Sequence, residues 1–344
     1  MKIKIGDKYI GDGCPTFIIA EIGSNHNQSF ELAIKHIDAA HAAGVDAVKF
    51  QTFKADKHVS KFAEMPKYLK GYDNIHELIK SLELSRDWQK PLKEYAESKG
   101  LLFFSSPCDY DAVDELEALQ VPAHKVASFD LPDLDLVRYI AKTKKPVLLS
   151  TGLADWMEIQ RAVDVCREEG NEQIALFQCT SLYPAPPNLS NLQSMKTMRE
   201  AFNVITGYSD HTLGDNIPVA SVALGAAIIE KHFTMDRTLP GPDHAFAIEP
   251  EELKVLVQRI REVESAIGLG EKNGPRGEEK DMYHKVRRSL HAAEDLEVDT
   301  VITEDMLVAK RPGFGIPIHL KEHVLGRKVA KSLKQDEWIT WEHI

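Results

Sequence analysis

The sequence predicts a TIM barrel, (β/α)8, in which eight parallel β-strands alternate with α-helices, followed by a small second domain. Three observations support this α/β fold class. Eight short runs rich in β-branched and aromatic residues recur along the chain, and segments with apolar residues at helical spacing separate them. The eight units together span about 250 residues, which is the usual size of such a barrel.

The predicted strands follow one another with a helical segment between each pair. They are TFIIAEIG (16–23), DAVKFQTF (46–53), LLFFSSP (101–107), HKVASFD (124–130), KPVLLSTG (145–152), QIALFQCTS (173–181), NVITGYSDH (203–211) and AAIIEKHFT (226–234). Strict alternation of strands and helices implies parallel pairing. Segments such as 31–44 and 155–170 end in Gly, the usual C-terminal stop of a helix.

An open, doubly wound sheet is the competing fold. It would require a Gly-rich dinucleotide-binding loop after the first strand, and AEIGSNHN is not such a loop. We therefore predict the barrel.

The chain is expected to divide into a barrel domain and a small C-terminal domain. A last helix over 251–270 completes the barrel domain, residues 1–270. Residues 271–285 are rich in Gly and charge, lack apolar periodicity, and are predicted to be a linker. Residues 286–344 show repeated hydrophobic alternation but are too few for a large core of their own.

Composition excludes several classes of protein. With 42 Lys and Arg against 53 Asp and Glu, the net charge of −11 argues against a nucleic-acid or membrane surface. No apolar run approaches a membrane span and no signal peptide is visible, so we expect a cytoplasmic protein. The four cysteines, Cys14, Cys108, Cys166 and Cys179, form no CxxC pair and are expected to be reduced, buried small hydrophobes.

Polar side chains gather at the C-terminal ends of the predicted strands, which form the active-site face of a TIM barrel. They are Glu21, Asn25, His26, Lys49, Gln51, Ser105, Ser106, Lys125, Ser128, Asp130, Ser150, Thr151, Thr180, Ser181, Tyr183, Ser209, Asp210, His211, Glu230, Lys231 and His232. Side chains alternate along a strand, so Glu230 and His232 share one face and Lys231 points to the other.

Two lysines among these residues predict an anion site. Lys49 and Lys125 lie near the ends of interior strands, where the usual explanation of a solvated surface lysine is weak. Lysine supplies charge and serine or threonine hydroxyls supply oriented donors, so this set suits a phosphate or a carboxylate.

Two histidines end neighbouring strands and predict a metal site. His211 and His232 follow the seventh and eighth strands, and adjacent strands lie about 4.8 Å apart. Each could instead be a hydrogen-bonded structural histidine. With two imidazoles and nearby oxygens, the site would be open and suited to Mn²⁺ most of all, with Mg²⁺ or Co²⁺ as alternatives.

The motifs IAEIGSNHN, VKFQTF, FSSP, HKVASFD, LLSTG, QCTSLYPAP, GYSDHTLG, ALGAAIIEKHFT and LPGPDHAFAIEP resemble, in order and spacing, the N-acetylneuraminate (sialic acid) synthase family. That family includes legionaminic and pseudaminic acid synthases and spore-coat polysaccharide synthases. The later segment VAKRPGFGI resembles the family's antifreeze-like (SAF) domain. The resemblance implies condensation of phosphoenolpyruvate with an open-chain N-acylated amino sugar, giving a nine-carbon 2-keto acid and phosphate.

The resemblance also implies roles for individual residues. Glu21 corresponds to the catalytic carboxylate, and His211 and His232 correspond to the metal ligands. The positions that bind phosphoenolpyruvate are Lys49, Ser106, Lys125, Ser128, Ser181 and Ser209, and those that contact the sugar are Gln51, Asp130, Tyr183, Asp243 and Arg311. Arg311 is similar to an arginine that the small domain extends into a partner's barrel, which implies a domain-swapped homodimer.

The acceptor sugar and the reaction class leave alternatives open. Asp130 stands where many sialic acid synthases carry Gly-Glu, and the loop 67–79 lacks an alignable sugar-binding asparagine. The acceptor could therefore be N-acetylmannosamine or a 2,4-diacetamido-2,4,6-trideoxyhexose. A metal-dependent barrel aldolase or isomerase, or an inactive carbohydrate-binding scaffold, are the rival functions.

Overall fold

The computed structural model describes residues 1–64 and 74–344. The chain forms two compact units, Met1–Gly268 and Leu269–Ile344. Part of the loop 67–79, in which no sugar-binding asparagine could be aligned, lies outside the described residues. No helix among the described residues is long and apolar enough to cross a membrane.

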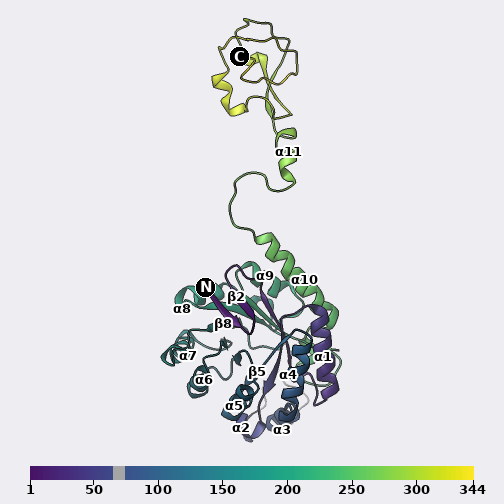
Figure 1. Ribbon diagram of the computed structural model, residues 1–344, viewed down its shortest axis with the longest axis vertical. Helices are drawn as coiled ribbons and strands as arrows, with labels where there is room; N and C mark the ends of the chain where they lie inside the picture. Colours follow the sequence, from purple (N-terminus) through teal and green to yellow (C-terminus); the bar gives the residue numbers. More distant parts are fainter. Residues whose placement is uncertain (65–73) are drawn as a thin grey trace. The chain divides into compact units, whose positions relative to one another are not determined.

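The first unit contains the eight predicted strands, and they form the predicted barrel (Figure 1). They are β3 (Phe17–Gly23), β4 (Ala47–Thr52), β5 (Leu102–Pro107), β6 (His124–Val126), β7 (Val147–Ser150), β8 (Ile174–Cys179), β9 (Ile205–Asp210) and β10 (Ile228–His232). Every ladder between them is parallel, in the order β5-β4-β3-β10-β9-β8-β7-β6. β5 and β6 lie next to each other and nearly close the ring.

Helices surround the strands (Figure 1). The larger ones are α1 (Phe30–Ala43), α4 (Gln89–Ser98), α5 (Tyr110–Ala118), α6 (Leu134–Ala141), α7 (Trp156–Glu168), α8 (Gln193–Phe202), α9 (Asn216–Ala223) and α10 (Pro250–Ile267), and α2 (Ala55–His58) and α3 (Ile75–Ser81) follow β4. Local chemistry fixes their ends: the Ser29 side chain caps α1. Gly44 ends α1 in the left-handed region at φ 82°.

The strand register places three of the predicted site residues side by side. Glu21 on β3 lies opposite Lys49 on β4, and His232 on β10 lies opposite Glu21. Because side chains alternate along each strand, the neighbouring apolar residue Phe50 points outward and packs against Phe103, with ring centroids 5.4 Å apart. The same register therefore builds the apolar layer under the helices and the polar layer inside the barrel.

An antiparallel hairpin that the sequence analysis did not predict precedes the barrel. Its strands are β1 (Lys2–Ile5) and β2 (Lys8–Gly11). Its glycines lie against the first residues of two barrel strands, since an added Cβ would meet Leu102 at Gly6 and Ile205 at Gly11. The hairpin thus covers the N-terminal end of the barrel. The alternation in KIKI was a usable signal, because every second residue of β1 is buried.

The second unit has its own small apolar core. It contains α11 (Glu279–Lys285) and an antiparallel pair, β11 (Ser289–Ala292) and β12 (Leu307–Lys310), with the 3-10 helices η4 (Glu304–Met306) and η5 (Ile318–His323). The core residues include Leu290, Leu296, Ile302, Val324, Val329, Leu333 and Ile339. Helix α11 occupies the second half of the predicted linker and buries none of its residues, which explains why no apolar periodicity marked it.

All four cysteines are free thiols, as expected, but they differ in burial. Cys166 and Cys179 are buried, whereas Cys14 and Cys108 are partly exposed. The expectation of four buried small hydrophobes was therefore wrong for two of them.

A buried ion pair joins the ends of β9 and β10 outside the polar interior. Lys231 Nζ lies 2.5 Å from Asp210 Oδ2 and donates to the Thr212 carbonyl oxygen at 2.6 Å. Lys231 therefore faces away from Glu230 and His232, as the strand alternation predicted. Removing one partner of a buried pair leaves an uncompensated charge.

We expect Lys231→Met to lower the free energy of unfolding by about 3–5 kcal/mol, because Asp210 would stay buried without its ammonium partner. Urea denaturation followed by circular dichroism measures this loss. Lys334→Met is the matched control, since Lys334 and Asp295 form a solvent-exposed pair. Equal unfolding midpoints for the two variants would contradict the prediction.

Candidate active site

A polar pocket opens at the C-terminal ends of the barrel strands. Its cavity measures about 1110 Å³ including the open mouth. The predicted residues that line it are Glu21, Lys49, Gln51, Ser106, Lys125, Ser128, Asp130, Tyr183, Ser209, His211, His232 and Asp243. The structure thus brings together every predicted site residue except Ser181, which is buried beside the lining, and Arg311, which belongs to the second unit.

Four charged side chains form the floor of the pocket. Lys49 Nζ lies 2.6 Å from Glu21 Oε2 and 3.8 Å from Glu230 Oε1, and Lys125 Nζ lies 3.8 Å from the same Glu230 oxygen. All four side chains are at most 6% exposed. Buried charges are stable only when they are paired, so each lysine here depends on a carboxylate and each carboxylate on a lysine.

The two carboxylates titrate differently. Burial raises the pKa of Glu21 to about 7, and the nearby Lys49 ammonium only partly offsets this effect. Burial acts on Glu230 as well, but Lys125 and Lys49 together hold its pKa below the usual range. Glu230 is therefore the fixed anion, and Glu21 is the group that can gain or lose a proton near neutral pH.

The pKa values of the two lysines also shift in opposite directions. Burial would lower the pKa of Lys49, but Glu21 and Glu230 raise it above its usual value. Burial lowers the pKa of Lys125, whose ammonium lies 5.1 Å from the centroid of the Phe177 ring. An anion entering the pocket would restore the charge balance around Lys125.

Hydroxyl groups surround the lysines. Lys49 Nζ donates to Ser106 Oγ at 3.2 Å, Lys125 Nζ donates to Ser150 Oγ, and Ser209 Oγ donates to Glu230 Oε1 at 3.1 Å. These hydroxyls occupy the ends of three different strands. The pocket floor is therefore rich in donors that can turn toward an anion.

Gly152, in the loop after β7, approaches two further serines closely. Its N–H donates to Ser128 Oγ at 3.1 Å. A Cβ at this position would meet Ser181 Oγ at 2.3 Å, Ser128 Oγ at 2.8 Å and Cys179 Sγ at 2.9 Å. Only glycine leaves these hydroxyls in place. Ser181 Oγ is buried with no hydrogen-bond partner among the described residues, so it is available to a ligand.

The two histidines meet at the pocket wall. The centroids of the His211 and His232 rings lie 5.3 Å apart. His211 Nδ1 lies 2.7 Å from the Thr180 carbonyl oxygen and donates to it, which leaves Nε2 unprotonated in the neutral ring. His232 Nδ1 is buried with no hydrogen-bond partner among the described residues. Burial lowers the pKa of both rings, so both are neutral and able to bind a cation.

The predicted sugar contacts line the same pocket. Gln51 Nε2 donates to Glu21 Oε1 at 2.8 Å, so Gln51 also orients the carboxylate. Asp243 Oδ2 lies 3.6 Å from His232 Nδ1, and burial raises the pKa of Asp243 to about 6. The Tyr183 ring packs on His211 with centroids 4.4 Å apart. Burial also raises the pKa of Asp130.

Several pocket residues received no role from the sequence. Glu230 and Ser150 were recognised as strand-end polar residues, and alternation with His232 already placed Glu230 inside the barrel. His58 and Cys108 line the pocket but carried no usable signal. His58 ends α2 in an irregular stretch after β4, where no periodicity indicates direction.

Comparison with known proteins identifies the family. The sequence model of the NeuB family matches residues 36–272, and that of the SAF domain matches residues 287–344. The N,N'-diacetyllegionaminic acid synthase of Legionella pneumophila is 40% identical, in an alignment that covers 98% of this chain and 97% of that protein.

Two solved structures are also similar to the chain. The spore coat polysaccharide biosynthesis protein SpsE of Bacillus subtilis is 34% identical with a TM-score of 0.70, covering 100% of this chain and 99% of that one. The N-acetylneuraminic acid synthetase of Leptospira borgpetersenii, solved with citrate, is 34% identical with a TM-score of 0.74, covering 82% and 94%. These matches confirm the family resemblance and the C-terminal domain. The chain is therefore an enzyme of the NeuB family that ends in a SAF domain.

Proposed function

We propose that this enzyme condenses phosphoenolpyruvate with the open-chain aldehyde of an N-acylated amino sugar, giving a nonulosonic acid and phosphate by C–O cleavage. The observation that carries the proposal is the arrangement of Lys49 and Lys125 around one buried carboxylate, Glu230, in a pocket that also holds two neutral histidines. The names of the Legionella and Leptospira relatives support the same product class.

The anion end of the pocket suits phosphoenolpyruvate. Its carboxylate and phosphate need two centres of positive charge and many donors, and the floor offers two ammonium groups and several serine hydroxyls. In the proposal, the residues that bind it are Lys49, Ser106, Lys125, Ser128, Ser181 and Ser209. Ser150 and Gly152 hold Lys125 and Ser128 in place.

His211 and His232 fit a divalent ion, which we propose to be Mn²⁺, with Mg²⁺ or Co²⁺ as alternatives. Both rings are neutral, and His232 has a buried nitrogen without a partner among the described residues. Among the described residues, no third His, Cys, Asp or Glu donor lies at ligand spacing from both histidines. An ion held by this pair would therefore leave several coordination positions to water and substrate. When bound, such an ion polarises the aldehyde oxygen as a Lewis acid.

Glu21 is proposed to handle the proton of the attacking water. C3 of phosphoenolpyruvate forms a bond to the aldehyde carbon as the carbonyl π bond breaks, so the aldehyde oxygen becomes an alkoxide and positive charge develops at C2. Water adds at C2 and gives its proton to Glu21, whose pKa of about 7 suits a base at neutral pH. Glu21 passes this proton to the alkoxide, which becomes the new hydroxyl. The C2–O bond to phosphate then breaks, the remaining proton of the added water leaves with the phosphate, and the 2-keto acid is left, while Lys49 and Lys125 stabilise the departing phosphate.

The sugar end is proposed to include Gln51, Asp130, Tyr183 and Asp243. We propose that Arg311 reaches the pocket of a second copy in a domain-swapped homodimer. Of the two candidate acceptors, the 2,4-diacetamido-2,4,6-trideoxyhexose is favoured over N-acetylmannosamine by the legionaminic acid synthase among the relatives.

The test of the function is a sugar panel. Phosphate release should depend on both phosphoenolpyruvate and a sugar, with the 2,4-diacetamido-2,4,6-trideoxyhexose turned over faster than N-acetylmannosamine. Mass spectrometry should detect a nine-carbon 2-keto acid, and ¹⁸O from water should appear at its C2 rather than in phosphate, because the C–O bond breaks. Absence of phosphate release with every sugar would refute the proposal, and ¹⁸O in phosphate would refute C–O cleavage.

We expect His211→Ala and His232→Ala each to weaken Mn²⁺ binding by at least about 100-fold. Even substitution of a residue that only hydrogen-bonds to a metal ligand typically weakens metal binding about 10–100-fold. Electron paramagnetic resonance of free Mn²⁺ measures the binding without reference to turnover. His41→Ala, which removes an exposed imidazole from α1, is the control and should bind Mn²⁺ normally. Unchanged Mn²⁺ binding in both pocket variants would rule out the ligand assignment.

For Glu21, we expect kcat to fall as the pH drops below about 7, because protonation removes the carboxylate that accepts the water proton. Glu21→Gln should lower kcat by about 10²–10⁴-fold and abolish this acid limb. Glu264→Gln is the control and should keep the acid limb. Glu264 accepts a hydrogen bond from the N–H of Thr16, which precedes β3 at the end of that strand away from Glu21 and the pocket. An acid limb that survives in Glu21→Gln would assign the titration to another group.

A further inference from the structure

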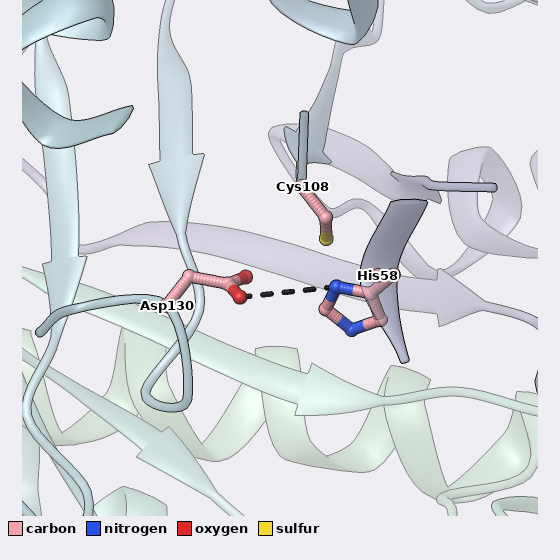
Figure 2. Close-up of side chains that lie close together, drawn as sticks. All are labelled: His58, Cys108 and Asp130. Carbon is pink, nitrogen blue, oxygen red and sulfur yellow. Dashed lines mark ion pairs between the residues drawn. The ribbon is translucent and has the colours of Figure 1, made fainter. Parts of the chain in front are cut away.

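A second set of metal-ligand atoms lies in the pocket wall, separate from the two histidines. His58, Cys108 and Asp130 place one nitrogen, one sulfur and one carboxylate oxygen within 4.8 Å of one another. We call these three residues the His-Cys-Asp cluster. They come from the end of α2 and from the segments after β5 and β6, and Figure 2 shows their side chains pointing toward one another.

The fold leaves the donor atoms of the cluster almost unused. His58 Nδ1 lies 4.0 Å from Asp130 Oδ1, beyond hydrogen-bond distance. Asp130 Oδ2 is buried with no hydrogen-bond partner among the described residues. Among the described residues, the Cys108 thiol makes a long contact with the Ser106 carbonyl oxygen, at 3.8 Å, and it also faces the Asp130 carboxylate. A buried carboxylate oxygen without a donor is costly, so the arrangement is better explained by a ligand than by packing.

The ring of His58 is held in place from behind. It stacks on Phe53 with centroids 5.7 Å apart and an interplanar angle of 22°. This stacking contact favours one orientation of the imidazole plane. The His58 side chain remains 26% exposed and the Asp130 side chain 13%, so an ion can reach the cluster from the pocket.

We propose that the His-Cys-Asp cluster binds a thiolate-preferring divalent ion of the Zn²⁺ class, with three protein ligands and the fourth position open to the pocket. Imidazole, thiolate and carboxylate are all zinc ligands, at about 2.0–2.3 Å from the ion, and a tetrahedral ion needs its ligand atoms about 3.3–3.8 Å apart. The separations, at most 4.8 Å, must therefore contract by up to about 1.5 Å, which rotation of the three side chains can supply.

Binding displaces one proton. Burial and the neighbouring Asp130 carboxylate raise the pKa of Cys108 well above its ordinary value, so the empty site carries a thiol. The incoming ion forms the metal–sulfur bond, and the thiol proton leaves to solvent, since only the thiolate is a ligand.

The two donor sets of the pocket differ in their metal preference. The histidine pair has two imidazoles and no sulfur, which suits ions that keep oxygen ligands, whereas a thiolate selects Zn²⁺ or Co²⁺ over Mn²⁺ and Mg²⁺. Zn²⁺ bound to Asp130 would prevent that carboxylate from contacting the sugar. Zn²⁺ should therefore inhibit the condensation competitively with respect to the sugar, and this consequence alone rests on the proposed function.

Co²⁺ absorption tests the site directly, because Co²⁺ bound to a thiolate gives an intense near-ultraviolet charge-transfer band. When metal-free full-length protein is titrated with Co²⁺, this band should appear with the intensity expected for one thiolate bound to each ion. Cys108→Ser should lose the band, and His58→Ala should weaken binding by at least about 10-fold. Cys179→Ser is the matched control and should keep the band, because its sulfur lines the same pocket but contacts Ser128.

Absence of the band in the unaltered protein, or a band that survives in Cys108→Ser, would overturn the proposal. So would a band lost in Cys179→Ser. Circular dichroism of each variant shows whether a lost band reflects unfolding. If Cys108→Ser unfolds, the His58→Ala titration decides the matter, and unchanged Co²⁺ binding in that variant would overturn the proposal. The readout does not require turnover, so a failure of the proposed condensation would leave this test intact.

Discussion

The pairing of Lys49 with Glu21 across two adjacent strands is the constraint on which the rest of the pocket depends. Both side chains are almost fully buried, and the β3–β4 register places them opposite each other. A slip of one residue would turn Lys49 into the apolar layer and Phe50 into the polar interior. The charges inside the barrel and the hydrophobic packing outside it therefore specify the same register.

The charge arrangement is unequal, and this inequality gives the pocket its chemistry. Two buried carboxylates share two ammonium groups, but Glu230 faces both lysines while Glu21 lies beside one. The pKa values of the two carboxylates consequently move in opposite directions. An environment that separates two similar groups in this way assigns them different tasks without any further catalytic residue.

Much of this structure could be predicted from the sequence. The eight strands were identified from β-branched and aromatic runs, and alternation along β10 correctly separated Lys231 from Glu230 and His232. The short hairpin β1–β2 was missed because its signal, two buried isoleucines in KIKI, is only four residues long. Helix α11 was missed because it buries nothing.

The electrostatic details and the His-Cys-Asp cluster lay beyond sequence reasoning for a different reason. The opposite pKa shifts of Glu21 and Glu230 depend on which oxygen lies near which ammonium group. His58, Cys108 and Asp130 come from three segments that are well separated along the chain, and only the closed barrel brings them together. Such contacts have no local pattern to reveal them.

Gly152 shows that the pocket is defined by empty space as well as by functional groups. A single added carbon would lie within 3.0 Å of Ser128, Ser181 and Cys179, so no other residue fits without displacing a hydroxyl. The hydroxyls proposed to bind phosphate therefore share a steric limit set by a residue that has no side chain. For an engineer who reshapes this pocket, position 152 is a fixed boundary, and new volume has to be sought at the sugar end.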